Sequence, residues 1–283
     1  MKIFEFSFNA KKRKDRFFEV FFYEPKSPKK KPKGSLYVVG ELKNALEFNA
    51  TFLKQLSETI QKEYYSSSLK GATLALKAAL KAANHFLAQE SKKGNVDWLG
   101  NLNLAVLLFI TVQEKKTMFH LAKTGTIKVS LVRHGMAVNI GKNLEASSKQ
   151  PGKVFGNLVS GTLMPNDSVT AATQEIFDVV SKEKSLEEIG NLREAKEFRA
   201  FFLKHERMIS RSCGVLISFI IEEEIAKRSL INKSLFSFFP KPRMILPKMK
   251  LELPWIRCPP ALRKHVVLLL LLFCVLLVGS LLF

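Results

Sequence analysis

The sequence predicts an α+β protein built in layers, and three observations favour this class. Apolar residues alternate with polar ones near the N-terminus, as at Phe4, Phe6 and Phe8, which is the period of a strand. Two long stretches with apolar residues three and four positions apart then follow each other directly, which is the period of helices. Several further strand patterns come after this pair. A contiguous helix pair between runs of strands favours a layered α+β domain over a parallel doubly wound sheet.

The first half of the chain is expected to hold three strands and the helix pair. A loop rich in Lys and Pro over 26–33 separates the second strand from the third. Alanine fills much of the second helix, and Gly94 with Asn95 ends it. Strands are expected over 1–9, 16–23 and 35–41, and helices over 45–64 and 69–90.

The second half is expected to be rich in strands. The stretch LNLAVLLFITVQ is strongly apolar and bounded by loops, so it is expected to be a buried strand. His134 and Gly135 are expected to form a hairpin turn between two others. Strands are expected over 102–113, 117–123, 128–133, 136–140, 168–172 and 214–221, and helices over 186–192 and 194–208.

The charge balance points to an anionic neighbour. The 283 residues include 45 Lys and Arg against 25 Asp and Glu, a net charge of +20. Ten of these basic residues lie within 225–264, beside a single acid, Glu252. Because this tract holds much of the excess, and no aromatic residues interleave with the N-terminal basic runs, nucleic acid is not an expected partner. Three widely spaced Cys and five unclustered His give neither a disulfide framework nor a zinc site.

An apolar stretch at the C-terminus, VVLLLLLFCVLLVGSLLF over 266–283, predicts a transmembrane helix. No charge interrupts it, and as a helix it would be about 27 Å long, close to the bilayer's hydrocarbon thickness of about 30 Å. The membrane helix is expected over 265–283 with the lipid bilayer as its partner, and it places Val266, Leu270, Phe273, Leu277 and Phe283 in the membrane.

The basic tract over 225–264 sets the expected orientation. Positive charge stays on the cytoplasmic side, so the chain is expected to be a single-pass membrane protein whose N-terminal domain, 1–224, is cytoplasmic. The tract contains six Pro residues and therefore cannot be one long helix. It is expected to be a linker that is either extended against anionic headgroups or simply solvated, and the sequence favours neither.

Four segments of the chain follow one another in a specific order. They are the strand SLYVVGELKNA, the helix pair, the turn in LAKTGTIKVSLVRHG, and FGNLVSGTLMPNDSVTAATQEIFDVV. This order, over about 14–221, resembles that of the metal-dependent (PPM-type, type 2C) protein phosphatases. The resemblance implies a four-layer sandwich of two antiparallel β-sheets flanked by helices. The residues that match the family's pattern are Gly125, Leu131, Arg133, Gly135, Asp167 and Thr173.

Several positions that hold metal-ligating aspartates in that family carry other residues here. Glu41 and Leu42 stand where the family has Asp-Gly at a strand end, and Gln174 and Glu175 stand where it has another Asp-Gly. Thr126 replaces a further aspartate. Mg²⁺ and Mn²⁺ require several carboxylate oxygens, so no metal cofactor is expected. The positions of this degenerate site are Asp15, Glu41, Leu42, Gln174, Glu175 and Arg211.

The resemblance, together with the missing aspartates, implies a catalytically inactive phosphatase-like protein. Such a protein would bind a phosphorylated or acidic protein partner, or act in signalling, at the cytoplasmic face of a membrane. Two alternatives remain open at this point. One is an active metal-dependent serine/threonine phosphatase with Mg²⁺ or Mn²⁺ in a rearranged site that uses Asp15, Glu41 and Glu175. The other is a structural or nucleic-acid-associated membrane protein.

Overall fold

The computed structural model of the chain describes residues 1–9, 12–25, 34–69, 71–113, 116–144, 153–181 and 185–222. Contacts divide the chain into two units, Met1–Met249 and Lys250–Phe283, and every described residue belongs to the first. The predicted linker and membrane helix, over 225–264 and 265–283, lie outside the described residues. Within the described ranges, no helix is long and apolar enough to span a bilayer.

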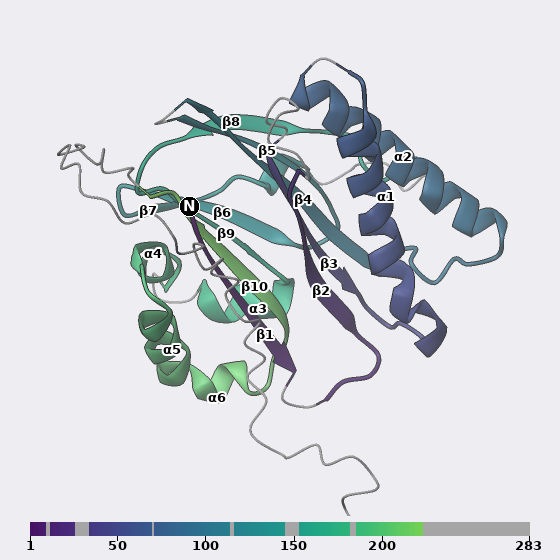
Figure 1. The fold of residues 1–283 in the computed structure, drawn as a ribbon. Coiled ribbons are helices and arrows are strands. Elements are labelled where there is room, and N and C mark those ends of the chain that lie inside the picture. Colours follow the sequence, from purple (N-terminus) through teal and green to yellow (C-terminus); the bar gives the residue numbers. More distant parts are fainter. Residues whose placement is uncertain are drawn as a thin grey trace, which may run out of the picture. The chain divides into compact units, whose positions relative to one another are not determined.

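Two five-stranded antiparallel sheets form the centre of the described unit (Figure 1). Sheet A consists, in spatial order, of β1 (Lys2–Asn9), β10 (Cys213–Ile220), β9 (Ser168–Ala172), β6 (Lys128–Arg133) and β7 (Met136–Asn139). Sheet B consists of β2 (Phe17–Tyr23), β3 (Ser35–Leu42), β4 (Leu102–Gln113), β5 (Lys116–Thr124) and β8 (Val159–Leu163).

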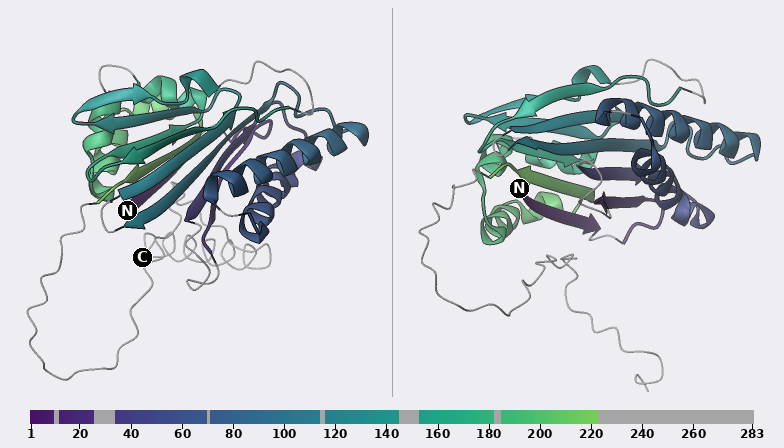
Figure 2. Two further views of the ribbon diagram at one scale, coloured as in Figure 1. Left: turned by 90° about the horizontal axis from the view of Figure 1, so that it is seen from above. Right: turned by 45° about the horizontal axis from the view of Figure 1, so that its top comes forward.

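Helices cover the outer face of each sheet, as the two views in Figure 2 show. Sheet B is covered by α1 (Phe52–Ser66) and α2 (Ala72–Lys92), and a short 3-10 helix, η1 (Glu47–Thr51), precedes them. Sheet A is covered by α3 (Gln174–Val180), α4 (Ser185–Asn191), α5 (Ala195–Lys204) and α6 (Glu206–Ile209). A second 3-10 helix, η2 (Lys142–Leu144), follows β7.

The core lies in three apolar layers, because each strand presents alternate side chains to its two faces. The central layer joins the inner faces of the two sheets and includes Val39, Leu107 and Phe219. On the outer side of sheet A, the three alternating Phe residues of β1 pack against α5, with the Phe4 and Phe198 ring centroids 4.7 Å apart. A third layer joins sheet B to α1 and α2. This arrangement confirms the four-layer sandwich that the sequence predicted.

Most predicted elements are present, and the differences have local causes. The helix predicted over 194–208 is two helices, because His205 leaves the helical conformation at φ −104° and ψ 13° between α5 and α6. The helix predicted over 45–64 begins as η1 and becomes α-helical only at Phe52. The sequence patterns predicted neither β8 nor the seven-residue α3. The five residues of β8, VSGTL, are mostly small and exposed.

One end of this sandwich carries the positions singled out by the sequence. In sheet A it is the end where Asn9 of β1 pairs with Cys213 of β10. In sheet B it is the end where Leu42 of β3 pairs with Phe17 and Leu102. The described chain leaves sheet A at the other end of β10, where Ile220 pairs with Lys2.

Candidate functional site

Glu41 is the innermost acid of the candidate site. It shares a face of β3 with Tyr37 and Val39, so its side chain points between the two sheets, and it is fully buried. Asn103, directly opposite on β4, donates from Nδ2 to Glu41 Oε2 at 3.2 Å. Lys43 Nζ lies 3.7 Å from the same oxygen. The buried carboxylate is thus held by one amide and one ammonium group from its own sheet.

Arg16 joins this carboxylate to a second one. Its NH1 lies 3.4 Å from Glu41 Oε1, and its NH2 lies 2.6 Å from Glu175 Oε1. Arg16 immediately precedes β2 of sheet B, whereas Glu175 is the second residue of α3, which packs on sheet A. A single guanidinium group, 13% exposed, therefore connects the two halves of the sandwich through its two acids.

Arg13 extends the same arrangement toward solvent. It binds both carboxylate oxygens of Asp15, at 3.0 Å from Nε and 2.6 Å from NH2, and its NH1 lies 3.8 Å from Glu175 Oε1. The hydrogen bonds from Arg13 lower the pKa of Asp15. Glu175 Oε2 also accepts the Cys213 backbone N–H at 3.0 Å. We call the group formed by Arg13, Asp15, Arg16, Glu41 and Glu175 the acid–arginine cluster.

Thr126, at a position where the resemblance implies an aspartate, is fixed beside the cluster. Asn103 Oδ1 accepts both the Thr126 backbone N–H at 2.8 Å and its hydroxyl at 3.0 Å. Lys43 Nζ lies 3.4 Å from the Thr126 hydroxyl oxygen. Gly125 is required there, because its φ is +70° and an added Cβ would collide with Asn103 Oδ1. This position therefore offers a hydroxyl group that is already bonded, and no charge.

The other predicted site residues lie outside the cluster. Leu42 is buried in the layer between sheet B and its helices, so it faces away from Glu41. The Gln174 amide donates to Asp178 of its own helix at 2.5 Å. Arg211 is exposed in the turn before β10, and its side chain has no hydrogen bond or ion pair to another described residue. The cation that forms ion pairs with Glu41 and Glu175 is Arg16 instead. The sequence pattern did not single out Arg16, although it directly follows Asp15.

Arg133 and Asp167, which match the family pattern, form an ion pair at the end of the strands opposite to the acid–arginine cluster. Arg133 binds Asp167 through Nε at 3.0 Å and through NH2 at 2.6 Å, and it also donates to the Thr162 carbonyl at 3.0 Å. Asp167 Oδ2 further accepts the Met164 N–H at 2.7 Å. This ion pair fixes the loop between β8 and β9 to the end of β6, so Arg133 is already occupied by an internal carboxylate.

The donor set of the cluster does not fit a pair of divalent cations. Mg²⁺ and Mn²⁺ are held by several oxygen ligands, among which carboxylates supply the charge. In the cluster, each of the three carboxylates is already within ion-pair distance of a guanidinium or ammonium group. Over the described part of the chain, no three His, Cys, Asp or Glu residues form a group that could hold a metal ion.

Replacing Glu41 with glutamine is expected to change how stability depends on pH. Burial raises the pKa of the Glu41 carboxyl above its ordinary value of 4.5, and this outweighs the opposite effects of Lys43 and Arg16. Between 4.5 and the raised pKa, the folded chain binds more protons than the unfolded chain. The stability of the wild-type protein relative to Glu41→Gln should therefore increase as the pH falls through this window. Urea denaturation of both proteins at several pH values measures the difference in their free energy of unfolding. A difference that does not change with pH would contradict a raised pKa of Glu41.

Comparison with known proteins identifies the fold. No family model matches the chain, and no curated protein matches its sequence. Among solved structures, a bacterial serine phosphatase aligns with a TM-score of 0.54 at 10% identity, covering 78% of this chain and 97% of its own. The serine/threonine phosphatase of S. agalactiae aligns with a TM-score of 0.52 at 8% identity, covering 77% and 100%. The chain therefore has the two-sheet fold of PPM-type serine/threonine phosphatases, and at these identities the likeness shows the fold alone.

Proposed function

We propose that this chain is a phosphatase-like binding protein that does not carry out two-metal phosphate hydrolysis. The observation that carries the proposal is the position of the Arg16 guanidinium group, which lies between Glu41 and Glu175. The resemblance implies a metal-ligating aspartate at the position of Glu41 and another at Gln174, the residue directly before Glu175. A guanidinium group supplies positive charge to two carboxylates, as a metal ion would, but it offers no Lewis-acidic centre and activates no water.

The charge balance of the cluster supports the same conclusion. Three acids, Asp15, Glu41 and Glu175, face Arg13 and Arg16 directly, and Lys43 approaches Glu41. Two divalent cations would add four positive charges to a group whose acids are already neutralised, and the repulsion would be screened least beside Arg16 and the buried Glu41. A single-metal site built from Asp15, Glu41 and Glu175 meets the same obstacle, because guanidinium groups lie between the three acids.

Binding a protein partner at the cytoplasmic face of a membrane is the function that we propose in place of catalysis. The apolar segment over 265–283 is the proposed anchor, and the basic tract before it is the reason for the cytoplasmic orientation. The acid–arginine cluster lies at the end of β10 opposite to the end where the described chain leaves. A phosphorylated or acidic partner is proposed to bind at this cluster end of the domain.

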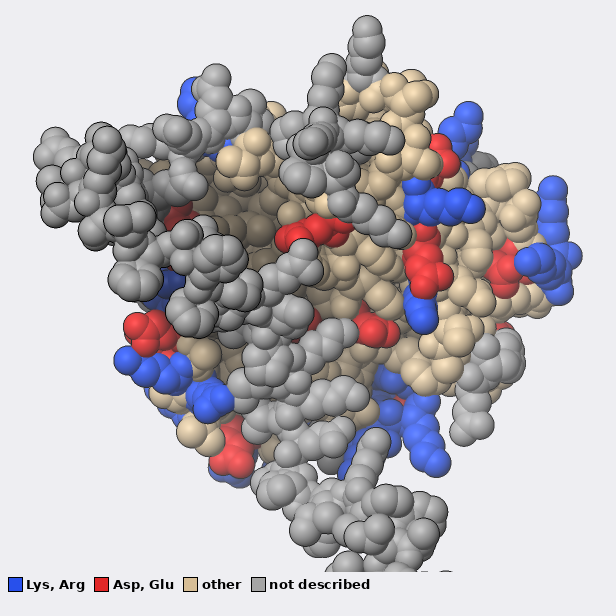
Figure 3. All heavy atoms as spheres, in the orientation of Figure 1, with Lys and Arg blue, Asp and Glu red and all other residues tan. Residues whose placement is uncertain are grey.

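The distribution of charge supports a protein partner rather than nucleic acid. On the face seen in Figure 3, Lys and Arg are interspersed with Asp and Glu over the described residues, and no continuous basic field is visible there. Binding of a nucleic-acid backbone relies on many clustered Lys and Arg side chains. The two-sheet sandwich also argues against the alternative of a structural or nucleic-acid-associated protein, in which the likeness to the phosphatases would be coincidental.

A metal titration with an activity assay tests the proposal. Full-length protein is titrated with MnCl₂ to millimolar concentration in a calorimeter, and hydrolysis of a phosphopeptide and a chromogenic phosphate ester is measured in parallel. We expect no saturable heat and no hydrolysis above the buffer rate, because the acids are held by Arg16 and Arg13.

The Glu41→Ala and Glu175→Gln variants provide the control for a contaminating phosphatase. Hydrolysis that survives in both variants comes from another protein and leaves the proposal intact. Hydrolysis by the wild type that either variant abolishes, or a titration that fits two ions per chain, would show a working metal site and overturn the proposal.

A further inference from the structure

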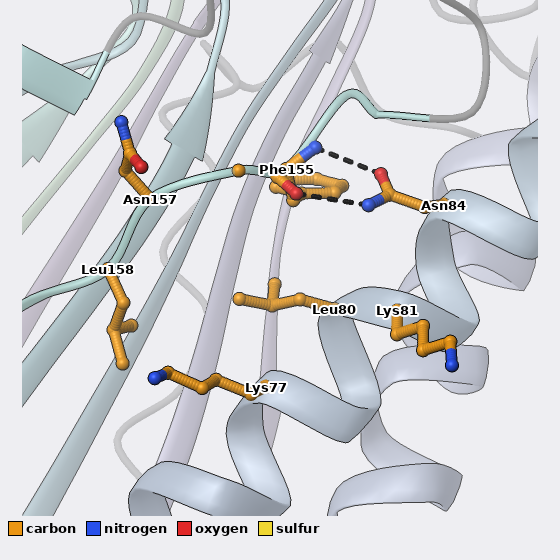
Figure 4. A pocket seen from close by; sticks show the side chains of 8 residues that line it. Lys77, Leu80, Lys81, Asn84, Phe155, Asn157 and Leu158 are labelled. Atoms are coloured by element: carbon orange, nitrogen blue, oxygen red, sulfur yellow. Dashed lines mark hydrogen bonds between the residues drawn. The ribbon is translucent and has the colours of Figure 1, made fainter.

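A pocket on the outer side of sheet B has no part in the candidate site. It has a volume of about 430 Å³ and lies between α2 and the segment 155–158, which leads into β8 (Figure 4). Lys77 and Lys81 of α2 flank it, and its apolar part is formed by Leu80, Phe155 and Leu158. The pocket therefore combines an apolar floor with two cations at its rim.

One side chain of α2 ties the segment 155–158 to this helix. Asn84 of α2 donates from Nδ2 to the Phe155 carbonyl at 3.0 Å and accepts the Phe155 N–H at its Oδ1 at 2.9 Å (Figure 4). The Phe155 ring is buried in the layer between sheet B and its helices. The segment is thus fixed to α2 at Phe155, while Gly156 and Asn157 beyond it are exposed.

The segment that lines one side of the pocket includes backbone groups that are bonded to no other described residue. Pairing of β8 with β5 begins only at Val159, opposite Leu121. Within the described ranges, the backbone groups of Gly156 and Asn157 form no hydrogen bond. An extended peptide can pair with such groups, as it does at the edge of a sheet.

Among the described residues that line the pocket, both charged ones are lysines. Lys77 and Lys81 are one helical turn apart and exposed, and the Lys77 side chain extends toward Leu158 (Figure 4). The single acid of α2, Glu90, lies in the last turns of the helix and is bonded to Lys93 and Asn95. The neighbouring helix differs, because Lys54 of α1 faces Glu58 at 3.9 Å. Near the pocket, the lysines of α2 have no such acid on their own helix.

We infer that this pocket docks an extended acidic peptide segment in which an apolar side chain lies between two carboxylates. Side chains of an extended peptide alternate in direction, so the apolar one enters the floor while both neighbours turn toward the rim. Those two neighbours are about 7 Å apart, and the Cβ atoms of residues one helical turn apart are about 5–6 Å apart. Lys77 and Lys81 therefore match the spacing of the two carboxylates. This inference is independent of the proposed loss of metal binding.

Fluorescence anisotropy with full-length protein tests the docking. The probe is a fluorescein-labelled peptide with one leucine between two glutamates in a glycine–serine background, and its control carries glutamine in place of glutamate. We expect the glutamate peptide to bind, the glutamine peptide to bind much more weakly, and added salt to reduce the difference. The double variant Lys77→Gln and Lys81→Gln should weaken binding about tenfold at low ionic strength.

A matched variant separates the pocket from the general charge of the protein. Lys54→Gln and Lys62→Gln remove the same charge from exposed positions of α1, and they should leave the affinity within about twofold of the wild type. Equal affinities for the two peptides, equal losses in the two double variants, or no binding of the glutamate peptide would each overturn the inference. Loss of sedimentation with phosphatidylserine vesicles in the Lys77→Gln and Lys81→Gln variant, without peptide binding by the wild type, would identify a membrane contact instead.

Discussion

Replacement of Arg16 by methionine is expected to lower the free energy of unfolding by about 3 kcal/mol at neutral pH. Glu41 is fully buried and Arg16 is 13% exposed, so the lost ion pair lies where solvent screens little. Removing one partner of a buried pair leaves the other charge without compensation, which costs more than the pair itself contributed. Methionine keeps the length and the apolar part of the side chain, so the loss reports on charge. Urea denaturation followed by circular dichroism measures it.

Arg13→Met is the matched control, because Arg13 contacts Glu175 as well but is more exposed, as is its main partner Asp15. Solvent screens such a pair, and we expect its removal to change stability little. Lowering the pH should also restore part of the stability that Arg16→Met loses, because a protonated Glu41 needs no counter-charge. Equal losses in the two variants would show that the link between Glu41 and Glu175 does not stabilise the fold.

Gly214→Ala is expected to cost about 3 kcal/mol or more, for two reasons that act together. Gly214 has a φ of +150°, a conformation that L-residues with side chains rarely adopt. An added Cβ would also collide with Thr173 Oγ1 and would lie 3.1 Å from Ile176 Cγ1. The collision with Thr173 would also disturb a hydrogen bond, because Thr173 Oγ1, at the start of α3, accepts the Val215 N–H at 3.2 Å. The close approach of β10 to α3 also brings the Cys213 N–H to Glu175.

Gly71→Ala separates backbone strain from crowding. Gly71 also has a positive φ, +109°, but an added Cβ would meet no atom within 4 Å. Its replacement should cost less than Gly214→Ala, about 1–2 kcal/mol, from backbone strain alone. Thermal and urea denaturation of the two variants give the comparison. A similar cost for both would mean that α3 moves away from β10 with little loss, and the geometry of Glu175 would then be less firmly set than the structure indicates.

Much of the fold could be predicted because its signals are local. The strands over 102–113, 128–133 and 168–172 were predicted with the bounds that the structure has. Each is an apolar or alternating stretch that a strand buries on at least one face. The elements that were missed, β8 and α3, are short, and β8 has small residues at an edge of sheet B, where pairing with β5 decides their structure.

The candidate site could be predicted only in part. The sequence pointed to Glu41, Glu175 and Asp15, and the structure brings all three to one end of the sandwich. It did not point to Arg16, because an arginine at the start of a strand is ordinary for an exposed end. Likewise, no sequence pattern indicated that Arg211 would be exposed to solvent.

The sequence alone determined the number and kind of most elements and the alternation that buries Phe4, Phe6 and Phe8 on one side of β1. It also determined that other residues stand at several positions where the resemblance implies aspartates. Only the tertiary structure decided which cation neutralises the remaining acids. Arg16 and Glu41 are 25 positions apart, and Glu175 comes from an element that packs on the other sheet. Periodicity reports which face of a segment is buried, but ion pairing between segments depends on how the two sheets bring their ends together in space.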